Sequence, residues 1–108
     1  MKVVYTQGYL ISKQDEQEDY IYFIFKGKCR LLVTTSSLPN PSIFQGKNRK
    51  QLVIGALKRG DSFGETSALN DLPNPFTVEC MTKEVHVYKI LRGHLIQYFG
   101  GELGDPVL

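Results

Sequence analysis

The chain has 108 residues, 42% of them hydrophobic and 22% charged, with a formal net charge of +2. This length suits one compact domain, and such a small net charge alone predicts neither a nucleic-acid partner nor binding to a membrane surface. No apolar stretch approaches the roughly 20 residues that span a bilayer, and the N-terminus lacks a signal-peptide pattern, so we expect one cytoplasmic domain over residues 1–108 without a membrane segment.

Short runs of β-branched and aromatic residues, separated by turn residues, predict strands in the first half of the chain. The expected strands cover residues 3–5, 9–12, 20–25 and 29–34. The last two flank a turn at residues 26–28, and we expect them to pair as an antiparallel hairpin. Residues 35–48 are rich in Ser, Pro, Asn and Gly, which predicts an exposed loop.

The second half of the chain continues as short strands with little helix. We expect strands at residues 51–57, 76–81 and 84–91, a short helix at 65–70 and a terminal helix at 92–99. The strands at 76–81 and 84–91 are expected to pair around residues 82–83. Pro73 and Pro75 exclude helix at the residue before each of them, so the segment around them is extended. Many short strands at regular spacing predict a sandwich or a barrel-like roll.

Few residues in the chain have the chemistry of a catalytic or metal site. Cys29 and Cys80 each lie inside an apolar run, which is typical of buried free thiols; a disulfide between them is the alternative. His86 and His94 are the two histidines, too few for a cluster of imidazole ligands. No serine or cysteine has a plausible base nearby in the sequence. We therefore expect no enzyme, no catalytic residue and no metal.

Basic residues are concentrated at residues 47–50, within the predicted exposed loop. The aromatic residues lie instead in the predicted strands, at positions typical of a core. A basic run in a loop, without aromatic residues beside it, is more often a solvated surface than a nucleic-acid footprint. We expect no nucleic-acid partner.

Residues 60–69 are the most informative stretch, because a glycine and an acid, Gly64 and Glu65, open the predicted short helix. The first backbone N–H groups of a helix have no partner inside it, so they can bind an anion. An acid beside them can accept hydrogen bonds from sugar hydroxyls. This combination suits a ligand that carries both a phosphate and a ribose.

The run from Gly60 to Leu69 resembles the phosphate-binding cassette of the cyclic nucleotide-binding domain family. The family pattern is roughly Gly-Asp-x-Phe-Gly-Glu-x-x-x-Leu, followed by an arginine, two small residues and a hydrophobic strand. The strand order also resembles the family's β-roll over nearly the whole chain. The resemblance implies a mainly β fold: an antiparallel β-roll, like a double-stranded β-helix with jelly-roll topology, with a short cassette helix and a C-terminal helix. Family members usually have helices before and after the roll, so we expect a domain of a longer protein.

The resemblance also implies which residues bind the ligand: Gly64, Glu65, Thr66, Ser67, Ala68, Asn74 and Phe76. Gly64 permits close approach of the backbone to a ligand, or it simply forms a tight corner. Glu65 corresponds to the acid that binds the ribose, or it is a first-turn acid stabilised by the helix dipole. Residues 66–68 offer backbone N–H groups to a cyclic phosphate. Leu69 is expected in the core beneath the helix.

Asn74 stands where the family has its phosphate-binding arginine, and Pro75 and Phe76 stand where two small residues are usual. Arginine supplies a permanently charged fork, whereas asparagine offers neutral donors on a short arm. Losing one partner of a buried charged pair costs about 2–5 kcal/mol, which predicts weak binding of nucleotide. Phe76 either stacks on the base or packs in the core.

The expected function is a non-catalytic regulatory module that binds cAMP or cGMP weakly, with no cofactor, and with an effector domain or a protein partner in a longer chain. The alternative is a degenerate domain that binds no nucleotide and serves protein–protein interaction or assembly. Replacing Asn74 by arginine is expected to strengthen nucleotide binding at least about tenfold.

Overall fold

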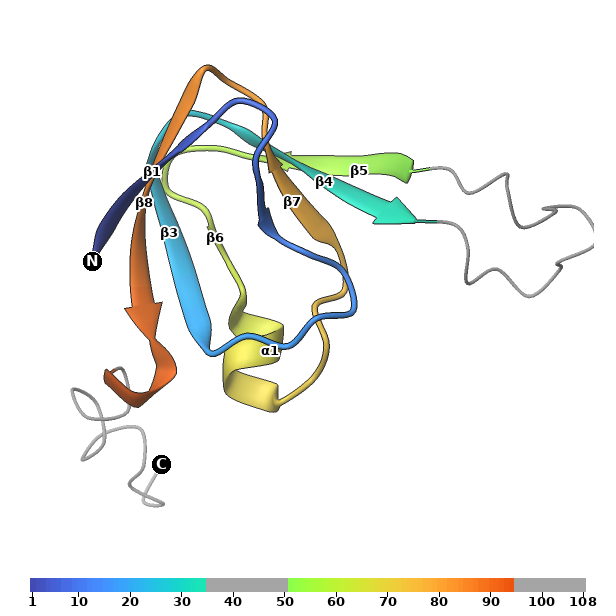
Figure 1. Ribbon diagram of the computed structural model, residues 1–108, viewed down its shortest axis with the longest axis vertical. Helices are drawn as coiled ribbons and strands as arrows, with labels where there is room; N and C mark the ends of the chain where they lie inside the picture. The colour runs from blue at the N-terminus through green and yellow to red at the C-terminus, as the bar shows by residue number, and fades with distance from the viewer. Residues whose placement is uncertain (35–50, 95–108) are drawn as a thin grey trace, which may run out of the picture.

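The computed structural model describes residues 1–34 and 51–94, in which eight strands form two four-stranded sheets. Sheet A has the order β1 (Lys2–Thr6), β8 (Glu84–Leu91), β3 (Tyr20–Lys26) and β6 (Ser62–Phe63). Sheet B has the order β2 (Leu10–Ser12), β7 (Thr77–Cys80), β4 (Cys29–Thr34) and β5 (Gln51–Leu57). Helix α1 (Glu65–Asn70) connects β6 to β7 below the space between the sheets (Figure 1). The expectation of a mainly β antiparallel roll is confirmed.

Consecutive strands mostly alternate between the two sheets, and this makes both expected pairings wrong. Strand β3 has β8 and β6 on its two edges, and β4 has β7 and β5 on its own. Neither strand has an edge left for the other, so the turn at residues 26–28 carries the chain from sheet A to sheet B. The same holds for β7 and β8, which lie in different sheets on either side of residues 82–83. Short local turns predict adjacency, but in a rolled sandwich they also form the corners between sheets.

The core lies between the two sheets. Its buried side chains come from both: Ile11, Tyr22, Ile24, Cys29, Phe63, Val78, Cys80, Val85 and Val87. The rings of Tyr22 and Phe63 stack with their centroids 4.6 Å apart, which joins β3 to the short strand β6. Strand β6 was not expected from the sequence, and it places Phe63 in the core directly before the start of α1.

The helix α1 buries a narrower face than the sequence suggested. Ser67 and Ala68 are its buried residues, whereas the side chain of Leu69 is 46% exposed. The expectation that Leu69 belongs to the core is wrong. A helix of six residues presents little more than one turn to the sheets, and Ser67 and Ala68 occupy that contact.

Two sequence expectations fall on residues that the structure does not describe. The loop expected at residues 35–48 lies outside the described part, as do residues 95–99 of the expected terminal helix. Residues 92–94 have helical conformation. Among the residues described, no helix is long and apolar enough to cross a membrane.

Candidate functional site

Gly64 begins the helix in a conformation that suits glycine. Its φ is 93° and its ψ is −3°, in the left-handed region, and it is the N-cap residue of α1 without a side-chain cap. A Cβ atom at this position would lie 2.6 Å from the carbonyl oxygen of Tyr20 and 3.2 Å from the ring of Tyr22. The turn is therefore seated directly on strand β3, and only glycine fits there without displacing the backbone.

The first hydrogen bond of the helix runs from the N–H of Ala68 to the carbonyl oxygen of Gly64, at 3.0 Å. The N–H of Ala68, which was expected to face a ligand, is thus used inside the helix. The N–H groups of Glu65, Thr66 and Ser67 precede this bond, as the first donors of any helix do. The set of amides available to an anion is therefore shifted by one residue from the expected set.

The carboxylate of Glu65 lies in the first turn of α1 and is half-buried. Its Oε2 accepts a hydrogen bond from the hydroxyl of Ser62, three residues earlier. This contact directs the carboxylate toward Ser62, at the N-terminal end of the helix. The arrangement fits both interpretations of Glu65, a group that accepts hydrogen bonds from a sugar and an acid stabilised by the helix dipole.

Ser67 is turned toward the loop between β2 and β3. Its side chain is buried, and its Oγ accepts a hydrogen bond from the N–H of Glu18 at 2.6 Å. The Oε1 of Glu18 in turn accepts a hydrogen bond of 3.1 Å from the hydroxyl of Tyr22. Burial raises the pKa of Glu18 above its ordinary value and, together with the neighbouring carboxylate, raises that of Tyr22. The hydroxyl oxygen of Ser67 is therefore already used as an acceptor within the protein.

Asn74, which the sequence pattern is expected to place at the arginine position, is only 3% exposed. Its Nδ2 donates to the carbonyl oxygen of Lys13 at 3.0 Å. Its backbone N–H donates to the backbone carbonyl oxygen of Glu16. Its own backbone carbonyl oxygen accepts from the N–H of Asp15, and both distances are 2.8 Å. Asn74 thus fastens the loop between β2 and β3 to the segment between α1 and β7.

Two further hydrogen bonds join the same segments. The side-chain amide of Gln17 donates to the backbone carbonyl oxygen of Asp71 at 2.6 Å. The backbone N–H of Gln14 donates to Oγ1 of Thr77 at 3.0 Å. We call the hydrogen bonds between residues 13–18 and residues 67–77 the clasp. Sequence reasoning expected strands at residues 9–12 and 20–25 with only a connection between them, and it missed the clasp. These partners lie about 50 to 60 residues apart, so no short-range pattern could have revealed them.

Phe76 is half-buried and packs against the core cluster, next to the first residue of β7. This placement agrees with the core role among the two expected for it. Of the seven candidate residues, the structure brings Gly64 through Ala68 together in one turn. Asn74 and Phe76 are directed to the clasp and to the core.

A hollow of about 420 Å³ lies on the other side of β3 from β6, lined by Gln17, Glu18, Asp19, Tyr20, Tyr22, Lys89 and Leu91. The ammonium group of Lys89 lies 4.1 Å from the centre of the Tyr20 ring, a cation–π contact.

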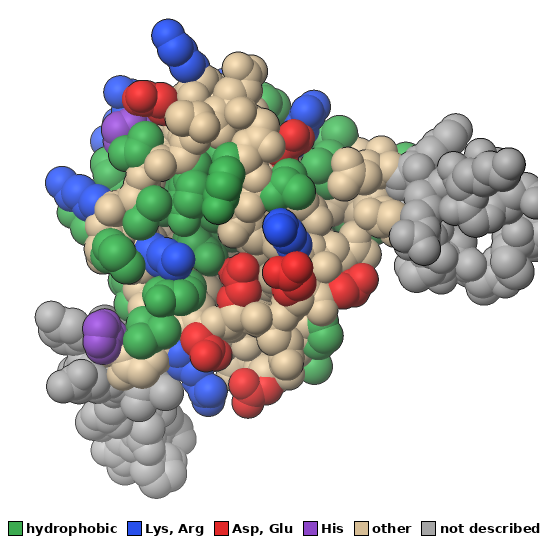
Figure 2. All heavy atoms as spheres, in the orientation of Figure 1, with side chains coloured by type: hydrophobic (Ala, Val, Ile, Leu, Met, Phe, Trp, Pro, Cys, Tyr) green, Lys and Arg blue, Asp and Glu red, His purple; other side chains and the backbone are tan. Residues whose placement is uncertain are grey.

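Acidic side chains gather on the visible face of the lower half of the molecule (Figure 2). Within residues 1–34 and 51–94, no three His, Cys, Asp or Glu side chains come together as metal ligands would.

Comparison with known proteins gives a consistent result. The family model described as "Cyclic nucleotide-binding domain" matches residues 2–100. The chain is 36% identical over 78 residues to a cAMP-dependent protein kinase regulatory subunit of Debaryomyces hansenii, a match that covers 72% of this chain and 14% of that protein. This chain therefore spans only a small part of that relative.

Two solved structures show the same fold at low sequence identity. The catabolite activator protein of Thermus thermophilus superposes with a TM-score of 0.74 at 20% identity, over 93% of this chain and 41% of that one. The regulatory domain of Toxoplasma gondii PKA, solved with cAMP, gives a TM-score of 0.72 at 22% identity, over 93% of this chain and 34% of that one.

Proposed function

The chain belongs to the cyclic nucleotide-binding domain family, and from that premise we propose that it is a non-catalytic regulatory module that binds cAMP or cGMP weakly at residues 64–67. The proposal includes a cytoplasmic setting and an effector domain or protein partner that responds to the bound ligand. It needs no cofactor and no metal.

The observation that carries the proposal is the turn at Gly64. This residue turns the backbone so that the amides of Glu65, Thr66 and Ser67 precede the first intrahelical bond, and the Glu65 carboxylate lies beside them. Such amides suit a phosphate, and the carboxylate suits the hydroxyls of a ribose. A cyclic nucleotide presents both groups on one rigid ring system. The relatives support the same ligand, since one is a cAMP-dependent regulatory subunit and another was solved with cAMP.

Two features make the proposed binding weak. Asn74 supplies no positive charge, and its side-chain amide is already bonded to the oxygen of Lys13. Acidic residues other than Glu65 are also numerous in the cassette and the facing loop: Asp15, Glu16, Glu18, Asp19, Asp61 and Asp71. Their charges oppose an anionic phosphate, although solvent screens those that are exposed. With the arginine pairing lost at about 2–5 kcal/mol, a micromolar binder would become a binder in the range from tens of micromolar to millimolar.

The second candidate function is a degenerate domain that serves assembly or contact with another protein. The clasp favours it, because the position that would carry the arginine is used to fix the cassette to the loop at residues 13–18. A cassette that is held in place without ligand has less to gain from binding one. The two candidates differ in whether the amides of residues 64–67 respond to nucleotide.

The experiment that separates them is an amide NMR titration of the 108-residue chain with cAMP and cGMP up to millimolar concentration. The proposal expects saturable shifts centred on Gly64 to Ser67, and no comparable response to adenosine 5′-monophosphate, whose doubly charged open phosphate lacks the compact ring. Unmoved amides in that turn at millimolar nucleotide would contradict binding by this chain and favour the degenerate candidate.

A matched variant tests the role of Glu65. Glu65→Gln keeps the size of the side chain and a hydrogen-bonding oxygen but removes the charge. Because hydrogen bonds to a charged acceptor are the stronger kind, we expect about tenfold weaker binding of cAMP. Glu16→Gln, on the exposed loop, removes the same charge away from the turn and is the control. Equal effects of the two changes would show that only overall charge matters.

A further inference from the structure

The two cysteines of the chain are direct neighbours across sheet B. Cys29 is the first residue of β4 and Cys80 the last residue of β7, and the register of the two strands places them opposite each other. Both are free thiols and both are buried, at 0% and 2% exposure. Sequence analysis left a disulfide between them as the alternative to free thiols, and the register now gives that alternative a geometry.

The backbone hydrogen bonds show which kind of cross-strand pair this is. The N–H of Cys80 donates to the oxygen of Tyr9, and its own oxygen accepts from the N–H of Gly8, both at 2.9 Å. Both groups thus point toward β2 and away from β4. Cys29 and Cys80 therefore form a non-hydrogen-bonded pair, in which Cα atoms of antiparallel strands lie about 4.5 Å apart. Disulfides span Cα distances of about 4.4–6.8 Å, so this site admits the bond with a small adjustment of the side chains.

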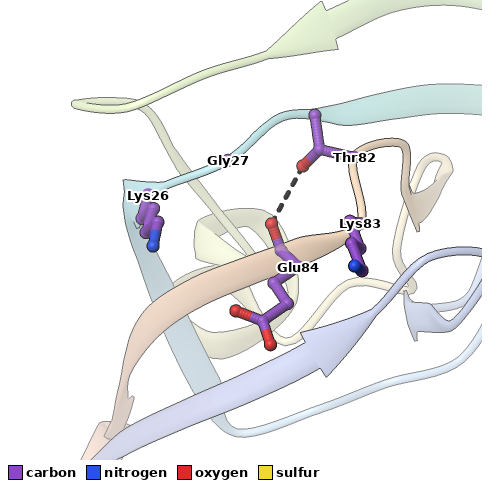
Figure 3. A pocket seen from close by; sticks show the side chains of 5 residues that line it. All are labelled: Lys26, Gly27, Thr82, Lys83 and Glu84. Carbon is purple, nitrogen blue, oxygen red and sulfur yellow. Dashed lines mark hydrogen bonds between the residues drawn. The ribbon is translucent and has the colours of Figure 1, made fainter.

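Hydrogen bonds from Lys28, the residue before Cys29, hold the start of β4 beside the end of β7. The oxygen of Lys28 accepts from the N–H of Met81 at 2.9 Å, and the N–H of Lys28 donates to Oγ1 of Thr82 at 3.0 Å. Beyond them lies a surface hollow of about 450 Å³ lined by Lys26, Gly27, Thr82, Lys83 and Glu84 (Figure 3). In it the Thr82 hydroxyl donates to the backbone oxygen of Glu84. The buried pair therefore lies at the end of a sheet, two residues along each strand from a corner that faces solvent.

We propose that Cys29 and Cys80 are a modification site, a cross-strand dithiol that a peroxide converts into an intramolecular disulfide. One thiolate attacks an oxygen of hydrogen peroxide, forming a sulfenic acid and releasing hydroxide, which takes up the proton lost by the thiol. The second sulfur attacks the sulfenic sulfur, the S–S bond forms, and water leaves. Together the two thiols lose two electrons and two protons, and the peroxide is reduced to two molecules of water.

Burial sets the rate of this reaction. It raises the pKa of Cys29 to about 12 and that of Cys80 to about 11, so both thiols are protonated at neutral pH. Oxidation therefore proceeds through local opening of the strand ends at the corner, which requires less free energy than global unfolding. The disulfide then cross-links β4 to β7, the strand that follows the cassette helix in the chain. A reducing agent breaks the disulfide.

The test is oxidation of the 108-residue chain by hydrogen peroxide, followed by denaturation, alkylation with N-ethylmaleimide and measurement of the intact mass. The expected product is monomeric, is lighter than the reduced chain by two hydrogen atoms and takes no N-ethylmaleimide until it is reduced with dithiothreitol. Its amide NMR spectrum keeps the dispersion of the reduced protein. Thiols that stay alkylatable, gain oxygen atoms instead or link two chains would overturn the proposal, as would an oxidised product without the native spectrum.

A relocated cysteine provides the matched control. Val78 lies on β7 two residues before Cys80 and is opposite Leu31, not opposite Cys29. The double variant Cys80→Ser with Val78→Cys keeps two thiols in the same strands but out of register. We expect it to form no intramolecular disulfide at the peroxide exposure that converts the native chain. Equal conversion would show that the bond forms in unfolded chains, and would overturn the assignment to the cross-strand pair.

Discussion

Gly64 lies so close to Tyr20 that a Cβ atom on the glycine would come within 2.6 Å of the tyrosine carbonyl oxygen. The same glycine has a φ of 93°, which L-residues with side chains rarely adopt. Sheet A thus contacts the cassette turn directly, through the backbone of Tyr20 and the ring of Tyr22. The position of the amides that follow Gly64 therefore depends on how the turn is seated on β3.

Gly64→Ala is expected to destabilise the protein by about 2–4 kcal/mol, because strain from the positive φ adds to displacement of the Tyr20 backbone. Gly60→Ala is the matched control, since Gly60 has a φ of 95° but nothing within 4 Å of its would-be Cβ. There we expect only the conformational strain, about 1–2 kcal/mol. Urea unfolding of the two variants measures the difference. Equal losses would mean that the contact with Tyr20 contributes nothing.

Removal of the side-chain bond of Asn74, one bond of the clasp, should cost stability without touching the turn at Gly64. Asn74→Ala removes the hydrogen bond of 3.0 Å that the carbonyl oxygen of Lys13 accepts from Nδ2. It also leaves a cavity, because the replaced side chain is only 3% exposed. We expect a loss of about 1–3 kcal/mol in the free energy of unfolding. Asn70→Ala, at an exposed position at the end of α1, is the control and should change stability by less than about 0.5 kcal/mol. A loss at Asn74 no larger than at Asn70 would show that the side-chain bond of Asn74 within the clasp is not stabilising.

Glu18 gives the clasp a dependence on pH. Burial raises its pKa above the ordinary value, so the folded protein holds a proton on this carboxyl more strongly than the unfolded chain does. The stability linked to that proton is fully present below the unfolded pKa of about 4.3 and is lost as pH rises through the higher folded value. Glu18→Gln removes the titrating carboxyl group and keeps a side-chain oxygen that can accept from the Tyr22 hydroxyl.

The stability of the wild-type protein relative to Glu18→Gln should therefore fall as pH rises from the unfolded pKa of about 4.3 through the higher folded pKa. Thermal unfolding followed by circular dichroism across that range measures the difference. Glu16→Gln, on the same loop and exposed, shows what loss of a surface carboxylate does. A flat difference between the wild-type protein and Glu18→Gln would contradict the burial of this group.

Most strands could be predicted because their signal is local. The run at residues 20–25 is rich in aromatic and β-branched residues, and β3 spans Tyr20–Lys26. Which strands pair could not be predicted in the same way. The turn at residues 26–28 is equally compatible with a hairpin and with a corner between sheets. Only the competition of β8 and β6 for the edges of β3 decides between them, and those strands lie far along the chain.

The backbone geometry of the candidate site was predictable to the same extent. The turn at Gly64 follows a local motif, and its left-handed conformation is a local property of glycine. The use of Asn74 is not local, because its partners Lys13, Asp15 and Glu16 come from the other end of the domain. The resemblance predicts a missing charge at this position, whereas the structure shows which hydrogen bonds the asparagine makes.

Asn74→Arg combines both effects and tests the proposed ligand most directly. Arginine restores a charged fork for the phosphate but gives up the hydrogen bond to Lys13. We expect affinity for cAMP to increase at least about tenfold while stability falls, because a long charged side chain has to leave the buried position of Asn74. Isothermal titration with cAMP at a temperature where the variant is folded measures the first effect, and urea unfolding measures the second.

The control is Asn74→Leu, which also removes the clasp bond but adds no charge. It should lose stability like the arginine variant and gain no affinity, so that a gain confined to arginine identifies charge pairing with the phosphate as the cause. If neither variant gains affinity, the obstruction lies in the shape of the site, and Phe76, in the place of a small residue, is the side chain to remove next. Phe76→Ala in the arginine background would then restore binding if bulk is the obstacle. Failure of that double variant as well would contradict the cassette as a nucleotide site.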